Sequence, residues 1–148
     1  MKLQKITVYY LFWLVAAIIA VIGIVHPDET LDINVHDTYF VISYLHAAFV
    51  LFVFYFLSGL GYWFVQKILR KKLEKWLTII HTVIVIGSFL LYWIVFFYNP
   101  GTEINPDFPL LYDFQSTNIV LVSEFLLTLF IATPIYIINL LIGIFRKS

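Results

Sequence analysis

The sequence predicts an all-α integral membrane protein that forms one domain with four transmembrane helices. Of its 148 residues, 62% are hydrophobic and 12% are charged, whereas soluble domains average about half apolar and a quarter charged residues. Crossing the hydrocarbon core of a bilayer takes about 20 apolar residues. Four stretches meet this length, at about residues 9–25, 39–64, 77–98 and 118–145.

The first stretch follows Lys2 and Lys5 and ends before His26-Pro27. Its apolar run is longer than that of a signal peptide, and it lacks a small-residue cleavage site, so we expect a retained helix. Proline disfavours helical geometry in the residue before it, which accounts for the predicted end.

The other three stretches carry local features that indicate how helices pack. Residues 58–61 of the second stretch read Ser-Gly-Leu-Gly, and such small side chains let helices approach closely in membranes. The third stretch has Tyr92-Trp93 near its predicted outer end, typical of an aromatic belt at the membrane surface. The fourth contains Pro134, which should kink the helix.

Charge predicts the orientation. All nine basic residues fall on one side of the four-helix topology: Lys2, Lys5, Lys67, Arg70, Lys71, Lys72, Lys75, Arg146 and Lys147. By the positive-inside rule that side is cytoplasmic, and so are both termini. We expect a multi-pass protein of the bacterial inner membrane. We expect membrane lipid to be a partner and nucleic acid not to be one. Because the chain has no cysteine, any metal site must use histidine, carboxylate or hydroxyl groups.

Three ionisable residues fall inside the apolar stretches, namely His46, His81 and Glu124. Such residues are costly in hydrocarbon and are functional candidates. A rise of about 1.5 Å per residue puts His46 and Glu124 at similar depths below the outer surface, so Glu124 is the candidate polar partner of His46. Glu124 could also be a neutral, hydrogen-bonded acid or a proton relay. His81 lies near the cytoplasmic end and cannot meet His46 across one metal ion.

We interpret His81 as a hydrogen-bonded or snorkelling residue, with metal ligation as the less favoured alternative. In a continuous helix, Tyr39 and Ser43 would share the face of His46, being seven and three residues earlier. Tyr44, two residues before His46, would face the opposite side.

The run His36-Asp37-Thr38-Tyr39, continued by apolar residues to Tyr44-Leu45-His46, resembles the opening of the tenth transmembrane helix of heme-copper oxidase subunit I. The pattern in that family is His-Asp-Thr-Tyr, a few apolar residues and His-x-His. The resemblance implies that His46 occupies the position of the histidine that ligates the low-spin heme in that family. Tyr44 replaces the histidine that ligates the high-spin heme of the oxygen-reducing centre.

The same resemblance implies that His36 and Asp37 bind magnesium or another divalent cation. An equal alternative is that the two side chains are solvated in a turn and bind no metal. The family's copper ligands lie on earlier helices that have no counterpart in this sequence. We therefore expect no complete oxidase in one chain, and whether the chain is an oxidoreductase subunit stays open.

These observations predict a homo-oligomeric heme-binding protein that transfers electrons or holds heme, with one histidine ligand per protomer. His46 is the candidate iron ligand, and the candidate pocket residues are Tyr39, Ser43 and Tyr44. The family's twelve helices form three arcs of four, so a trimer is slightly favoured over a dimer. The alternative is a non-catalytic accessory or assembly subunit of a respiratory complex. A small transporter or proton pathway through Glu124 and His46 is less favoured, since no inverted repeat is evident.

Overall fold

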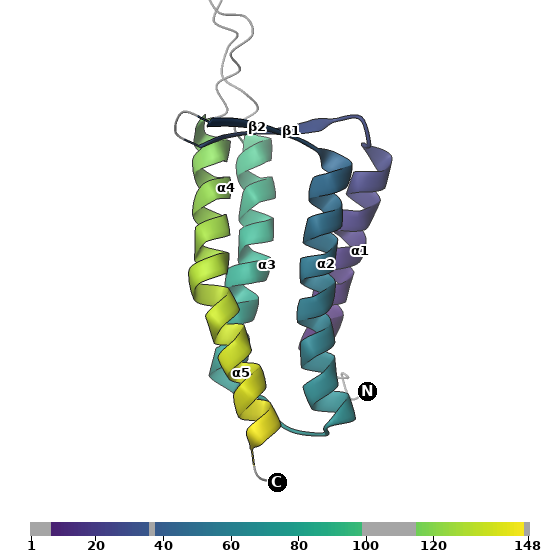
Figure 1. The fold of residues 1–148 in the computed structure, drawn as a ribbon, viewed down its shortest axis with the longest axis vertical. Helices are drawn as coiled ribbons and strands as arrows, with labels where there is room; N and C mark the ends of the chain where they lie inside the picture. The colour runs from purple at the N-terminus through teal and green to yellow at the C-terminus, as the bar shows by residue number, and fades with distance from the viewer. Residues whose placement is uncertain (1–6, 36–37, 99–114, 147–148) are drawn as a thin grey trace, which may run out of the picture.

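A computed structural model describes residues 7–35, 38–98 and 115–146. Within these ranges, four long helical segments stand side by side, and a two-stranded antiparallel sheet lies across one end (Figure 1). All four segments are long and apolar enough to cross a membrane. The prediction of a multi-pass integral membrane protein is therefore confirmed.

The helical segments are built as follows. The first is α1 (Val8–Val25), the second is α2 (Tyr44–Trp63) continued by the π-helical η1 (Phe64–Ile68), and the third is α3 (Lys75–Tyr98). The fourth consists of α4 (Gln115–Leu127), the π-helical η2 (Thr128–Ala132) and α5 (Thr133–Phe145).

α1 and α2 pack closely because each contributes glycine at the contact. A methyl group on Gly23 would overlap Ala48, and one on Gly59 would overlap the Trp13 ring. The Trp13 indole also donates a hydrogen bond of 3.3 Å to the carbonyl of Phe56. The small residues near the end of the second stretch thus allow the close approach that the sequence predicted.

The fourth segment bends where α4 gives way to α5 (Figure 1). Pro134 is at the start of α5, directly after η2, and its ring cannot donate the usual backbone hydrogen bond one turn back. The wider π-helical turn accommodates this loss, and the Thr133 hydroxyl donates to the carbonyl of Thr128 at 2.9 Å. The kink predicted at Pro134 is present.

Residues 30–35 and 38–43 form two antiparallel strands, here called the hairpin, which corrects the expected all-α fold and the expected start of the second helix. β1 (Thr30–Val35) and β2 (Thr38–Ser43) pair from Thr30 with Ser43 to Val35 with Thr38. β1 alternates apolar and polar residues, and β2 is rich in aromatic and β-branched residues, both of which favour strands. α2 consequently begins at Tyr44, five residues later than predicted.

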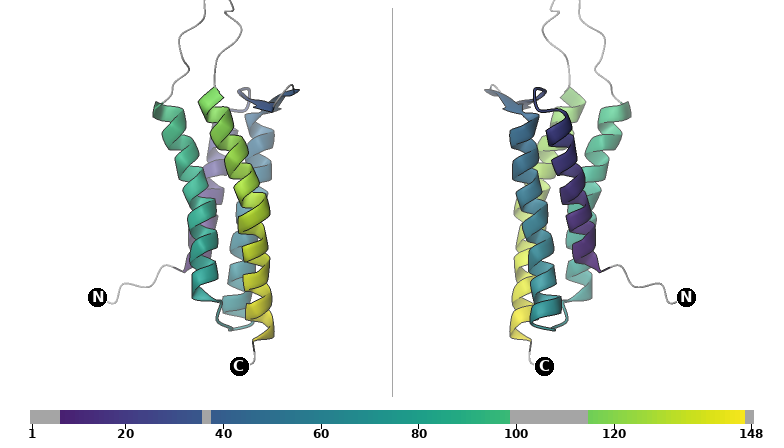
Figure 2. Two further views of the ribbon diagram at one scale, coloured as in Figure 1. Left: turned by 90° about the vertical axis from the view of Figure 1, so that its left-hand side faces the viewer. Right: turned by 90° about the vertical axis from the view of Figure 1, so that its right-hand side faces the viewer.

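The hairpin lies over the end of the bundle instead of beside it. β1 contacts α4 as well as α2, so the strands reach across from one helix pair to the other (Figure 1). The amide of Tyr44 donates to the carbonyl of Glu29 at 2.9 Å, which fixes the entry of α2 to the start of the hairpin. At the opposite end of the bundle α1 begins and α5 ends (Figure 2).

Candidate functional site

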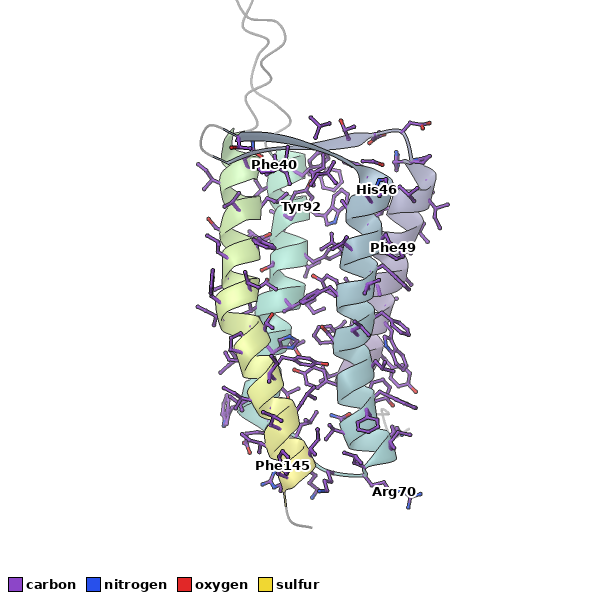
Figure 3. The ribbon with its side chains drawn as sticks, in the orientation of Figure 1. Phe40, His46, Phe49, Arg70, Tyr92 and Phe145 are labelled. Carbon is purple, nitrogen blue, oxygen red and sulfur yellow. The ribbon has the colours of Figure 1, made fainter. Side chains whose placement is uncertain are left out.

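His46 is the third residue of α2. Because α2 begins at Tyr44, His46 lies only about 3 Å below the start of the helix and not the 10 Å or so expected for a longer helix. Its side chain is exposed near the hairpin end of α2 (Figure 3). Among the described residues, none forms a hydrogen bond with it.

The surroundings of His46 on the outer surface of α2 are apolar. Phe49 is 66% exposed and Val50 is 65% exposed, and both lie one turn from His46 on the same side of the helix. Leu57 and Leu60 continue this side towards η1 and are also exposed. We call this surface, made of His46, Phe49, Val50, Leu57 and Leu60, the His46 face.

The predicted pocket residues are distributed differently. Tyr39 and Ser43 belong to β2, so the helical spacing that placed them on the side of His46 does not apply; their place in a heme pocket stays a prediction. The Ser43 hydroxyl donates to the carbonyl of Pro27 at 3.4 Å. Tyr44 is half-buried and is the first residue of α2.

Glu124 does not meet His46. Glu124 is the tenth residue of α4, whereas His46 is the third residue of α2. Counted from the hairpin end of each helix, Glu124 is therefore about 14 Å along α4 and His46 about 3 Å along α2. The expected shared layer was wrong because both helix starts were misplaced. The Glu124 Oε1 atom is buried without a hydrogen-bond partner in the described part of the chain.

His81 is a core residue of the other half of the bundle. It is 1% exposed, and its Nδ1 lies 2.8 Å from the Tyr62 hydroxyl. Its ring stacks between Phe12 and Tyr136, with centroid distances of 5.3 Å and 4.9 Å. This confirms the interpretation as a hydrogen-bonded residue. Because aromatic rings cover both faces of the imidazole, a flat cofactor does not fit beside it.

Asn139 is a buried polar residue that was not among the candidates predicted from the sequence. It is 0% exposed; its Oδ1 accepts a hydrogen bond of 2.9 Å from the amide of Glu74, and its Nδ2 donates to Thr78 Oγ1 at 2.8 Å. A lone asparagine in an apolar helix is the available sequence signal, since such residues hydrogen-bond between membrane helices. Here it joins α5 to the start of α3.

The fold and the His46 face define a multi-pass membrane protein with one outward-facing imidazole on an apolar surface. A family model described as "Cytochrome C and Quinol oxidase polypeptide I" matches residues 1–103, which is most of the 148-residue chain. The chain belongs to this family, subunit I of the heme-copper oxidases. No curated protein and no solved structure gives a significant match.

Members of this family bind heme, so the described residues were compared with what a heme site needs. The interior around His81 is packed, since Tyr9, Phe12 and Tyr62 are all below 2% exposure. The His46 face carries an imidazole that has no partner among the described residues, beside exposed apolar side chains. These are the kinds of group that line heme sites.

A metal site made of protein ligands is not seen in the described residues, where no group of three or more His, Cys, Asp or Glu side chains could hold a metal ion. The predicted divalent-cation pair, His36 and Asp37, lies outside the described residues. That prediction stays a prediction.

Proposed function

We propose that this protein binds heme through His46 as a homo-oligomer, with one histidine ligand per protomer, and that it transfers electrons or holds heme. The observation that carries the proposal is the exposed, unpartnered imidazole of His46 beside exposed Phe49 and Val50. Bound heme iron supplies one-electron redox chemistry. The task of His46 is to bind and orient the group, and the task of the two apolar side chains is to exclude water from it.

The second wall of the site comes, on this proposal, from another copy of the chain. Symmetry about the membrane normal places identical residues at equal depth, so the His46 faces of neighbouring protomers can meet. A trimer is slightly favoured over a dimer, because three four-helix units would reproduce the three arcs of the family's subunit I.

Tyr44 supports a role other than complete oxygen reduction. It stands where the family carries its high-spin heme ligand, and its side chain is half-buried within the same chain. A phenol in this position does not replace the missing imidazole. On its own, the chain is thus an electron-transfer or heme-holding subunit and not a whole oxidase.

The absorption spectrum of the purified protein, made with ample heme supply, tests the proposal. We expect a Soret band that shifts on reduction, and we expect His46→Ala to abolish it. His81→Gln is the matched control: it changes the core histidine, keeps a hydrogen-bonding side chain and should retain the band. Circular dichroism establishes that both variants are helical. A colourless wild-type protein would contradict the proposal, and so would loss of the band in His81→Gln alone.

The alternative function is a non-catalytic accessory or assembly subunit, and the family membership favours it equally. It predicts a heme-free protein that co-purifies with respiratory subunits. Pull-down from membranes with a tagged chain distinguishes the two. Heme in the isolated chain supports the leading proposal, and respiratory subunits without chain-bound heme support the alternative.

We also propose that both termini are cytoplasmic and that the membrane is a bacterial inner membrane. In support, the six basic residues of the described part of the chain are all at the end opposite the hairpin: Lys67, Arg70, Lys71, Lys72, Lys75 and Arg146. Reporter fusions to the C-terminus test the orientation. A fluorescent-protein fusion should fluoresce, and an alkaline phosphatase fusion should be inactive; the reverse pattern contradicts it.

A further inference from the structure

The connection between the second and third membrane segments is strongly basic. η1 ends at Ile68 and α3 begins at Lys75. Five cationic residues lie between positions 67 and 75, which we call the basic connection: Lys67, Arg70, Lys71, Lys72 and Lys75. Because so short a connection joins two membrane-crossing helices, it has to stay at the level of the lipid headgroups.

The basic connection is held in place by α5 and does not hang free. Lys71 Nζ donates a hydrogen bond to the carbonyl of Ile144, and Arg146 forms an ion pair of 3.9 Å with Glu74. The amide of Glu74 is fixed by Asn139 Oδ1 at 2.9 Å. These contacts account for Lys71, Glu74 and Arg146, and they hold the backbone that presents the remaining cations.

Four cations of the connection have no partner among the residues that the structure describes. Lys67, Arg70, Lys72 and Lys75 are exposed, and among the described residues no hydrogen bond or ion pair engages them. Arg70 has a φ of 52°, a left-handed conformation that is uncommon for a residue with a side chain. Its side chain points away from the end of the bundle (Figure 3).

Directly beside these cations lie exposed apolar side chains. Trp76 is 68% exposed and Ile68 is 53% exposed; they belong to the two helices that the connection joins. A tryptophan at this level is typical of the boundary between headgroups and acyl chains. The surface therefore combines positive charge at headgroup level with apolar side chains on the acyl-chain side. This arrangement is complementary to a phospholipid that has a negative headgroup and apolar chains.

We propose that the basic connection binds the phosphodiester headgroup of an anionic phospholipid. A guanidinium forms bidentate hydrogen bonds with phosphate oxygens, and each lysine or arginine at a membrane surface strengthens binding of anionic lipid by about fivefold. Phosphatidylglycerol is the simplest lipid of this chemistry. The proposal stands on the connection alone and does not depend on heme binding.

Quenching of Trp76 fluorescence by brominated lipids tests the proposal in vesicles of phosphatidylcholine. The quencher is brominated phosphatidylglycerol in one series and brominated phosphatidylcholine in the other. The part of the signal that is lost in Trp76→Phe reports the site. We expect half-maximal quenching of Trp76 at a fraction of phosphatidylglycerol that is lower than that of phosphatidylcholine by at least about fivefold, the contribution of one cation. Equal fractions for the two lipids would overturn the proposal.

Charge variants separate a site from the general surface potential. In Arg70→Gln/Lys72→Gln, which removes two of the four exposed cations of the connection, we expect the preference to fall several-fold, and both side chains are exposed, so the fold should persist. Lys2→Gln/Lys5→Gln removes two charges at another position of the same predicted membrane side and should retain the preference. If both double variants reduce it equally, the connection is no specific site.

Inorganic phosphate distinguishes a lipid from a free anion. Added phosphate should weaken the preference no more than chloride of the same ionic strength, which screens exposed charges. If phosphate abolishes the preference and chloride does not, the connection takes free phosphate, and the lipid proposal fails.

Discussion

The Tyr62 hydroxyl lies 2.8 Å from Nδ1 of His81, and this hydrogen bond joins α2 to α3 in the core. α1 and α5 reach the same imidazole through the stacked rings of Phe12 and Tyr136. All four membrane segments therefore meet at one buried side chain. A histidine that looks like a ligand candidate in the sequence is the centre of helix packing in this half of the bundle.

Replacing Tyr62 by phenylalanine should destabilise the fold. The change removes the hydroxyl and leaves the buried imidazole nitrogen without its partner, which costs about 1 kcal/mol, since hydrogen bonds between membrane helices average roughly 0.6 kcal/mol and unsatisfied buried groups cost more. Unfolding by SDS in mixed micelles measures the difference. Tyr10→Phe is the control, because Tyr10 is 55% exposed. Equal stability of Tyr62→Phe and wild type would contradict the assigned role.

The four spans could be predicted from the sequence because apolar length alone defines them. The hairpin was missed for the same reason: residues 39–43 are apolar enough to extend a membrane helix. Yet Leu31, Ile33 and Val35 alternate with polar residues, which is the strand signal. Weighing that alternation would have moved the helix start to Tyr44.

The misplaced helix start explains the errors at the candidate site. Depth was counted from residue 39, so His46 seemed level with Glu124. The sequence could not show which side of α2 is outward, because that depends on the contacts of α1 and α3 with it. The partners of His81 were equally beyond reach, since Phe12, Tyr62 and Tyr136 come from three different helical segments.

Gly61→Ala should be costly, whereas Gly87→Ala should not. A methyl group at Gly61 would overlap the Tyr136 hydroxyl and lie 3.0 Å from Leu140 Cδ1. Overpacking of this kind typically costs about 1–3 kcal/mol. At Gly87 nothing lies within 4 Å of the added group, so the better helix propensity of alanine should stabilise by up to about 1 kcal/mol.

The same unfolding titration compares the two glycine variants. We expect the midpoint to move down for Gly61→Ala and to stay or move up for Gly87→Ala. If both midpoints fall by the same amount, the loss follows from replacing a helical glycine at either position. The close contact between α2 and α5 is then not the cause.

Asn139→Leu should loosen the attachment of α5 to the start of α3. The variant keeps a similar volume but leaves the amide of Glu74 without the acceptor that lies 2.9 Å away, at a cost of about 1–3 kcal/mol. Hydrogen exchange of that amide measures the change locally and should become faster. In the control Thr82→Val, the lost hydroxyl donates within its own helix, to the carbonyl of Thr78, and exchange at Glu74 should be unaffected. Unchanged exchange in Asn139→Leu would contradict the assignment.

A single cysteine can show whether the His46 faces of neighbouring copies meet. The chain contains no cysteine, so Phe49→Cys introduces the sole thiol on a side chain that is 66% exposed beside His46. If protomers pack through this face, symmetry brings the same position of another copy to equal depth, and mild oxidation should link most chains into covalent dimers on a non-reducing gel. Phe130→Cys is the matched control, since Phe130 is 69% exposed on η2 of the fourth segment and should stay monomeric.

Crosslinking at both positions would indicate random collision in the membrane, and crosslinking at neither would contradict a shared heme site between copies. Combining Phe49→Cys with His46→Ala separates assembly from cofactor binding. If apolar packing of the faces drives assembly, the covalent dimer should form as in the single variant, while the Soret band is lost. If heme itself holds the copies together, the two signals should disappear in parallel. The histidine would then be the link between protomers as well as the iron ligand.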